Sequence, residues 1–208
     1  MTQSKLIYVH DPMCSWCWGF APNWLKLKSE LENNFKDILT IEYKVGGLAP
    51  DSQAPMPQNM QDMLQNTWRK IAAQLGTQFN YAFWQECQPR RSTYPACRAA
   101  LIARKANKEA DMVAAIQHAY YLNAQNPSDE NTLIELAQHI GLDKADFASS
   151  LQSHQVNDEL NKELAYAHSL PIQGFPSLVL ISNNNAFPIA INYTDWQQSF
   201  SQISAFLK

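Results

Sequence analysis

Two cysteines separated by two residues, Cys14 and Cys17, are the side chains of this 208-residue chain best suited to chemistry. An apolar run at 6–9 precedes them and is typical of a buried strand, and the pattern of 23–35 after them is typical of a helix. A helix N-terminus carries partial positive charge and free N–H groups, which favour the reactive thiolate form of cysteine. The spacing therefore predicts a redox-active pair. Two ordinary buried thiols, or half of a metal site, are the alternatives.

Composition limits the classes of function. Charged residues make up 17% of the chain, hydrophobic residues 46%, and the formal net charge is −3. Such a chain can bury a sizeable core, and its weak charge predicts neither a nucleic-acid partner nor an acidic membrane surface. We find no apolar run of about eighteen residues and no signal-peptide pattern, so we expect no membrane span and a reducing, cytoplasmic location. There, the four cysteines are expected to be catalytic or free.

The remaining pattern predicts a mixed sheet interrupted by a long helical segment. Besides 5–10, strands are predicted at 38–45, 177–181 and 187–192, with a hairpin turn at the asparagines 183–185. Apolar spacing predicts core-packed helices at 60–75, 95–107, 112–120, 128–140, 143–151, 156–167 and 194–206, with Ser128 and Thr194 as N-caps. We therefore expect residues 1–48 and 168–208 to form one discontinuous domain and 49–167 a helical domain inserted into it.

Three motifs in this order span almost the whole chain. They are Asp11-Pro12-Met13-Cys14-Ser15-Trp16-Cys17, then Leu136-Ala137…Gly141-Leu142-Asp143…Phe147 at the end of the helical insert, then Ile172-Gln173-Gly174-Phe175-Pro176 before an apolar strand. Together they resemble the DsbA-like thioredoxin superfamily, within a cytosolic bacterial branch of predicted protein-disulfide isomerases and oxidoreductases. The resemblance implies an α/β thioredoxin fold, a mixed four-stranded sheet with flanking helices, that carries an inserted all-helical domain.

The resemblance also implies roles. Cys14 is then the exposed nucleophile that attacks a substrate disulfide, and Cys17 the shielded thiol that resolves the mixed disulfide. Pro176 is the cis-proline facing the pair, and the backbone of Phe175 pairs with an extended substrate; Pro171 and Pro188 are the competing candidates for a cis bond. The implied activity is a thiol-disulfide oxidoreductase or isomerase acting on protein or small-molecule disulfides, glutathione among them. No cofactor is implied besides the Cys14–Cys17 disulfide.

The chain departs from the family pattern beside the cysteines. Periplasmic DsbA has a histidine directly before the second cysteine, where this chain has Trp16, and an acidic residue six positions before the first, where it has Tyr8. Strong oxidising power is therefore not implied. Trp16 and Trp18 form either a platform for substrate or a contact with the helical insert. His10 either favours the Cys14 thiolate when protonated or simply hydrogen-bonds the backbone.

Residues 87–104 hold further candidates. Cys87 and Cys97 are either two free thiols or, if breaks at Pro89 and Pro95 bring them together, a second redox pair. Four arginines are expected to form a solvated face, with a site for an anion such as a glutathione carboxylate as the alternative; they are Arg90, Arg91, Arg98 and Arg104.

Two rival functions remain open. Kappa-class glutathione transferases and related isomerases share the inserted thioredoxin architecture but typically lack the second cysteine, so Cys17 argues against them. A non-enzymatic metal site would need four ligands at suitable spacing. The sequence has no second Cys-x-x-Cys, and the nearest histidine is His10, so we expect no metal.

Overall fold

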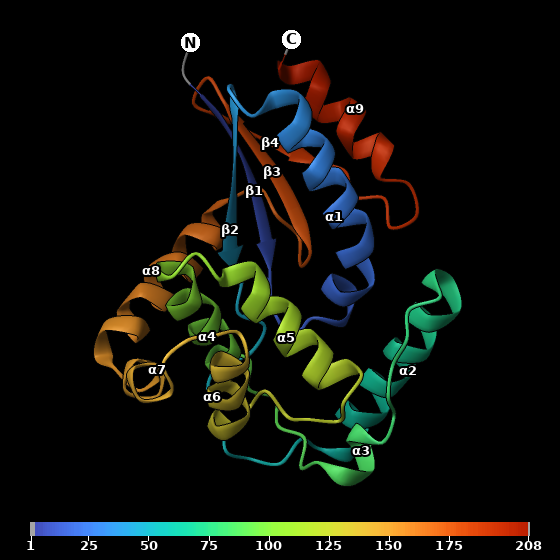
Figure 1. Cartoon of the computed structure of the whole chain (residues 1–208). Coiled ribbons are helices and arrows are strands. Elements are labelled where there is room, and N and C mark those ends of the chain that lie inside the picture. The colour runs from blue at the N-terminus through green and yellow to red at the C-terminus, as the bar shows by residue number, and fades with distance from the viewer. Residues whose placement is uncertain (1–2, 208) are drawn as a thin grey trace.

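A single mixed sheet forms the centre of the protein, whose computed structural model describes residues 3–207 (Figure 1). The elements are β1 (Ser4–His10), α1 (Ser15–Phe35), β2 (Leu39–Val45), α2 (Gln58–Leu75), α3 (Phe83–Glu86), α4 (Tyr94–Lys105), α5 (Glu109–Tyr121), α6 (Glu130–His139), α7 (Lys144–Leu151), α8 (His154–Ser169), β3 (Ser177–Ser182), β4 (Asn185–Ile189) and α9 (Trp196–Leu207). The strand order is β2-β1-β3-β4. β1 runs parallel to β2 and antiparallel to β3, which is antiparallel to β4.

Helices cover both faces of the sheet (Figure 1). α1 and α9 lie on one face, where Phe20 and Ile203 pack with Leu6. The end of α8 lies on the other face, where Ala167 packs with Ile7. Leu6 and Ile7 serve opposite faces because side chains alternate along a strand. This arrangement confirms the predicted fold class.

The helices from α2 to α8 all lie between β2 and β3 in the sequence. Between those strands the described chain contains no further strand, only a β-bridge between Pro55 and Arg90. Trp68 and Tyr121 centre an aromatic core whose buried residues include Met13, directly before Cys14. The core of the helical segment therefore extends up to the cysteine motif. The division into two domains stays a prediction, and α8 runs across its boundary at 167/168.

Helix α2 contradicts the expectation that its apolar stripe is core. Trp68 and Ile71 are buried, but Met63 is 54% exposed. Both buried residues lie in the second half of the helix, and the first half contains no buried residue. Among the described helices, none is long and apolar enough to cross a membrane.

Several predicted element boundaries are wrong. β4 starts at Asn185 and stops at Ile189, because Asn183 and Asn184 adopt positive φ (50° and 62°) and form the hairpin turn alone. α6 begins at Glu130, and the hydroxyl of Ser128, the predicted cap, donates to a backbone carbonyl of another segment instead.

The start of α9 and one short helix also differ from expectation. The hydroxyl of Thr194 donates to Asn192, and the side chain of Asp195 accepts the N–H of Gln197 at the start of α9. The short helix α3 has no counterpart among the predicted elements. α1 starts at Ser15, before the helix-like stretch at 23–35.

Candidate active site

Cys14 is the N-cap residue of α1. Its backbone is extended (φ −81°, ψ 117°), and its Sγ accepts the N–H of Cys17 at 3.4 Å. The first helical bond, from the N–H of Trp18 to the Cys14 carbonyl, measures 3.0 Å. The sulfur therefore lies at the positive end of α1, in the position that the strand–helix junction predicted.

The loop before β3 meets the same sulfur. The Phe175–Pro176 peptide bond is cis, and the Cys14 thiol donates to the Phe175 carbonyl at 3.5 Å. Sheet register brings the two segments together, because Val9 near the end of β1 pairs with Ser177 at the start of β3. The Phe175 backbone thus lies beside the cysteine pair, where the sequence motif placed it.

Gly46 makes room for the side chain of Phe175. A Cβ at Gly46 would lie 2.0 Å from the Phe175 ring, which no side chain tolerates. The sequence pattern marked Gly46 only as the end of β2, so this supporting role was missed. No local signal distinguishes a glycine that ends a strand from one that accepts a ring from a distant loop.

The two sulfurs differ in burial. Cys17 is 0% exposed, and burial, followed by the hydrogen bond and charge of Cys14, raises the pKa of its thiol well above the ordinary value. Cys14 is 5% exposed, so the expectation of an exposed nucleophile is wrong for this conformation. The Phe175 loop and the first turn of α1 lie against its sulfur. The order still holds, since Cys17 is the more deeply buried of the two.

A fully buried carboxylate, Asp11, lies behind the pair. One oxygen accepts the N–H of Met13 at 2.8 Å; the other accepts the N–H of Leu48 at 2.8 Å and the hydroxyl of Thr93 at 2.7 Å, and lies 3.6 Å from Cys97 Sγ. Burial raises the pKa of Asp11, and these hydrogen bonds oppose that rise. Asp11 therefore ties the cysteine turn to the helical segment.

Sequence reasoning quoted Asp11 within a motif but gave it no role. The only local signal was an acidic residue directly after an apolar strand.

Three tyrosines surround the pair. Burial raises the pKa of Tyr8, Tyr121 and Tyr193, and the neighbouring cysteines raise it further. Tyr121 donates its hydroxyl to the carbonyl of Met13 at 2.8 Å. The phenol of Tyr8, one of the departures noted in the sequence, therefore lies near Cys17.

His10 is not a protonated neighbour of the thiolate. It is 0% exposed, its ring stacks on Tyr8 at 5.1 Å and meets the edge of Tyr43 at 5.7 Å, and neither ring nitrogen has a hydrogen-bond partner among the described residues. Burial, and then the charge of Arg104, lowers its pKa to about 3. The hypothesis of a charged His10 is wrong because this aromatic core excludes the imidazolium.

Trp16 and Trp18 have different neighbours. Trp18 stacks on Tyr121 at 5.7 Å and donates its indole N–H to the Gln78 carbonyl at 3.0 Å, so it packs against the helical segment. Trp16 is half-buried, and its ring meets that of Tyr193 at 5.1 Å. The two rings therefore contact different parts of the molecule.

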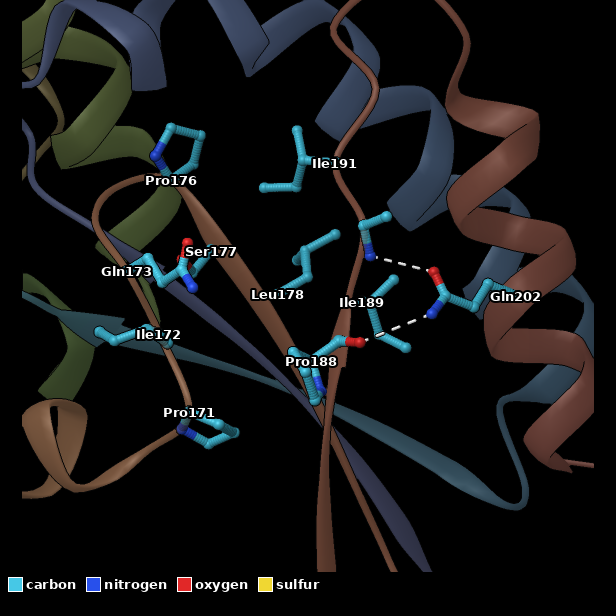
Figure 2. Close-up of a pocket in the computed structure, with 11 residues that line it drawn as sticks. Pro171, Ile172, Gln173, Pro176, Ser177, Leu178, Pro188, Ile189, Ile191 and Gln202 are labelled. Carbon is cyan, nitrogen blue, oxygen red and sulfur yellow. Dashed lines mark hydrogen bonds between the residues drawn. The ribbon is translucent and has the colours of Figure 1, made fainter.

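A groove of about 630 Å³ continues from the Pro176 loop along the end of the β3–β4 hairpin (Figure 2). Its walls are largely apolar, with Ile172 from the loop and Ile191 beyond β4. Figure 2 shows Gln202 of α9 beside it, accepting the N–H of Ala190 at 3.0 Å and donating to the Pro188 carbonyl at 3.5 Å. The groove offers an apolar surface that includes Pro176, the residue directly after Phe175.

The arginines do not form a solvated face. Arg98 is buried and pairs with Asp51 through two bonds of 2.7 and 2.8 Å, and Arg91 is half-buried. The other two pairs are Arg90 with Asp129, and Arg104 with Glu109 and Glu163. Carboxylates of this chain thus already occupy three of the four arginines.

Cys87 and Cys97 contact different partners and are free. Cys87 donates to the Ala124 carbonyl at 2.9 Å, whereas Cys97 lies at Asp11. Burial raises the pKa of both thiols, and the structure does not join them as a second redox pair. Within residues 3–207, no cluster of three or more His, Cys, Asp or Glu side chains is arranged to hold a metal.

Solved structures with this architecture include two close matches in shape. A Nitrosomonas europaea protein, provisionally assigned as a protein disulfide isomerase, is 25% identical with a TM-score of 0.82, covering 99% of this chain and 98% of its own. The cytosolic disulfide reductase DsbM from Pseudomonas aeruginosa is 22% identical with a TM-score of 0.78, covering 98% and 100%. DsbM has also been solved with GSH.

Among curated proteins, the chain is similar to the ClpXP adapter protein SpxH of Bacillus subtilis, with 25% identity over 178 residues. The match covers 84% of this chain and 57% of SpxH, so the chain spans little more than half the length of that relative. The family model of the DSBA-like thioredoxin domain matches residues 5–200. The chain therefore belongs to the DSBA-like thioredoxin domain family.

Proposed function

We propose that this protein is a thiol-disulfide oxidoreductase in which Cys14 attacks the substrate and Cys17 resolves the intermediate. The supporting observation is the contrast between the sulfurs. Cys14 Sγ lies at a helix N-terminus, 3.4 Å from the Cys17 N–H and 3.5 Å from the Phe175 carbonyl. Cys17 lies one turn deeper, fully buried with a raised thiol pKa. Cys14, the less deeply buried sulfur at the helix N-terminus, therefore suits the attacking role, and Cys17 suits the resolving role.

The chemistry consists of two exchanges. The Cys14 thiolate attacks one sulfur of the substrate disulfide, a Cys14–substrate disulfide forms, and the other half leaves as a thiolate. Cys17 then loses its proton and attacks Cys14 Sγ, which releases the second half as a thiolate. The protein ends as the Cys14–Cys17 disulfide, having given two electrons and two protons to the substrate. The reverse sequence oxidises a dithiol, and a mixed disulfide that returns to another substrate cysteine isomerises it.

Protein and small-molecule disulfides both suit the surroundings. The Phe175 backbone lies beside Cys14, where an extended segment can pair with it, and the groove beyond Pro176 offers apolar contact (Figure 2). DsbM is named a cytosolic disulfide reductase and was solved with GSH, which supports glutathione as a candidate substrate and a cytoplasmic location. SpxH is named an adapter of ClpXP, which supports protein partners.

Two single-cysteine variants test the mechanism. Cys14→Ser should abolish reduction of oxidised glutathione and of a disulfide-bonded protein such as insulin. Cys17→Ser should accumulate a mixed disulfide at Cys14, visible in the intact mass and reversed by dithiothreitol. Disulfide exchange that survives Cys14→Ser would overturn the assignment.

Measurements on the wild-type protein separate the two rival functions. Free thiols counted before and after a mild oxidant should fall by two, with the disulfide mapped to Cys14 and Cys17. A transferase of the kappa type would instead keep its thiol count while conjugating glutathione. A metal-binding protein would carry stoichiometric metal in an assay of the purified protein.

A further inference from the structure

Close packing at Gly19 fixes helix α2 against the cysteine motif. Gly19 follows Cys17 by two residues, and a Cβ there would lie 3.0 Å from Ile71 and 2.9 Å from Leu75. Ile71 is 0% exposed. The backbone at Lys70, one residue before Ile71, is therefore held beside the first turns of α1.

The ammonium group of Lys70 lies at the rim of the site. Its Nζ is 5.9 Å from the centroid of the Trp16 ring, the side chain between the two cysteines. Lys5, Lys44 and Lys105 each have a glutamate oxygen at 2.8 to 3.5 Å. Among the described residues, Lys70 forms no such ion pair. The ammonium group of Lys70 lies over the face of the Trp16 ring and can bind an anionic ligand.

The surroundings of Lys70 add positive rather than negative potential. The N-terminal turn of α1 contains no acidic residue, so its positive end is not neutralised there. The acidic residue on α2, Asp62, lies about two turns away and accepts a hydrogen bond from Gln58. The carboxylate nearest in sequence to the pair, Asp11, is buried and fully hydrogen-bonded. An incoming carboxylate therefore meets attraction at this rim.

We propose that Lys70, lying over Trp16, is an anion subsite that selects disulfides bearing a carboxylate close to the sulfur. The substrate class is the low-molecular-weight, glutathione-type disulfide, and the inference rests on the proposed function. The carboxylate pairs with the ammonium while Cys14 attacks the adjacent sulfur. The exchange itself is unchanged, so Lys70 sets substrate preference and takes no proton. This assigns the anion-binding role to a lysine of α2 in place of the four arginines, three of which already pair with carboxylates of this chain.

Three disulfides of different charge test the proposal. The reduced protein is mixed with oxidised glutathione (anionic), hydroxyethyl disulfide (neutral) or cystamine (cationic), and tryptophan fluorescence follows oxidation of the pair. The readout is the rate ratio of oxidised glutathione to hydroxyethyl disulfide, which cancels general losses of reactivity. Lys70→Gln should lower this ratio about threefold and Lys70→Glu about tenfold. Lys70→Glu should also raise the rate ratio of cystamine to hydroxyethyl disulfide.

Lys26→Glu is the matched control. It makes the same charge change on an exposed position of α1, about 18 Å along the helix from Cys14. The control should keep the wild-type ratio, and about 0.5 M NaCl should reduce the wild-type preference. A Lys70→Glu ratio within about twofold of wild type would overturn the proposal, as would an equal fall in Lys26→Glu. If none of the three disulfides oxidises the wild-type protein, the proposed function itself fails. Lys70→Gln, which introduces no charge, gives the answer if Lys70→Glu does not fold.

Discussion

The two sides of the cysteine motif are built differently. Its outer side consists of the Phe175 loop, the Trp16 ring and the Lys70 ammonium, all within reach of a substrate. Its inner side consists of buried polar groups, Asp11 and His10 among them. The outer side can recognise a partner, whereas the inner side can act only through stability and through the pKa of Cys17. Substitutions on the two sides should therefore change different measurements.

The largest expected effect is on the inner side. Asp11→Asn should lower the free energy of unfolding by about 3 kcal/mol, because an amide has one acceptor oxygen where the carboxylate serves donors with two. It should also lower the pKa of Cys17, since the charge of Asp11 raises it. Urea unfolding and the pH dependence of Cys17 alkylation in a Cys14→Ser background measure these effects. Thr93→Val removes the hydrogen bond to Asp11 and the one from the Ala49 N–H but keeps the charge, so it should cost about 2 kcal/mol and leave that pH dependence unchanged. Equal pH profiles for wild type and Asp11→Asn would contradict the electrostatic part.

The second effect is the difference between the sulfurs. Brief iodoacetamide treatment of the reduced protein near neutral pH should label Cys14 about a hundredfold faster than Cys17. That ratio corresponds to about 2.7 kcal/mol in activation free energy. Peptide mapping by mass spectrometry gives both rates in one sample, with Cys87 as an internal reference. Faster labelling of Cys17 would reverse the assigned roles.

The third effect tests the support of the outer side. Gly46→Ala should displace the Phe175 ring and with it the loop at Cys14, costing about 2 kcal/mol of stability and lowering the rate of disulfide reduction. In a Phe175→Ala background the same substitution should cost far less, because the ring is gone. This double-mutant cycle isolates the contact. Additive effects would show that Gly46 acts elsewhere.

An effect of similar size, but visible only on acidification, is a pH dependence from His10. Its folded-state pKa of about 3 lies below the unfolded value near 6.5, so between these values only the unfolded chain binds the proton. This group's contribution to stability is therefore lost as pH falls from about 6.5 toward 3. From pH 7 to pH 5 the wild type should lose about 2 kcal/mol more than His10→Phe, which keeps the ring stack but cannot titrate. Parallel losses in the two proteins would mean that His10 is reached by water.

Sequence alone was sufficient where the signal is local. The thiols at a strand–helix junction located the reactive pair, and apolar periodicity located most of the strands and helices. It failed where partners are far apart in the chain. Asp11 contacts Thr93, 82 positions away, and Arg104 contacts Glu163, 59 positions away. The local sequence at Asp11 or at Arg104 does not indicate whether the folded side chain will contact water or a polar group from a distant segment.

The interpretations of His10 and of the arginines were wrong for the same reason, because their neighbours come from distant parts of the chain. Both assumed solvent at positions that the fold fills with aromatic rings or with carboxylates. Whether His10 is charged depends on how deeply the side chain is buried, and the periodicity of apolar residues does not predict that depth.

The amide of Gln202 has a consequence for association between molecules. β4 is an edge of the sheet, and unpaired N–H and C=O groups on an edge can template the addition of a strand from another chain. Gln202 presents a donor and an acceptor to the Pro188 carbonyl and the Ala190 N–H, as a neighbouring strand would. Pro188 itself has no N–H to offer. The side chain of Gln202 on α9 thus occupies the hydrogen-bonding groups that an added strand would use, and it protects this end of β4 against aggregation. Because Gln202 lies on a helix, a search for aggregation-prone strands would not include it.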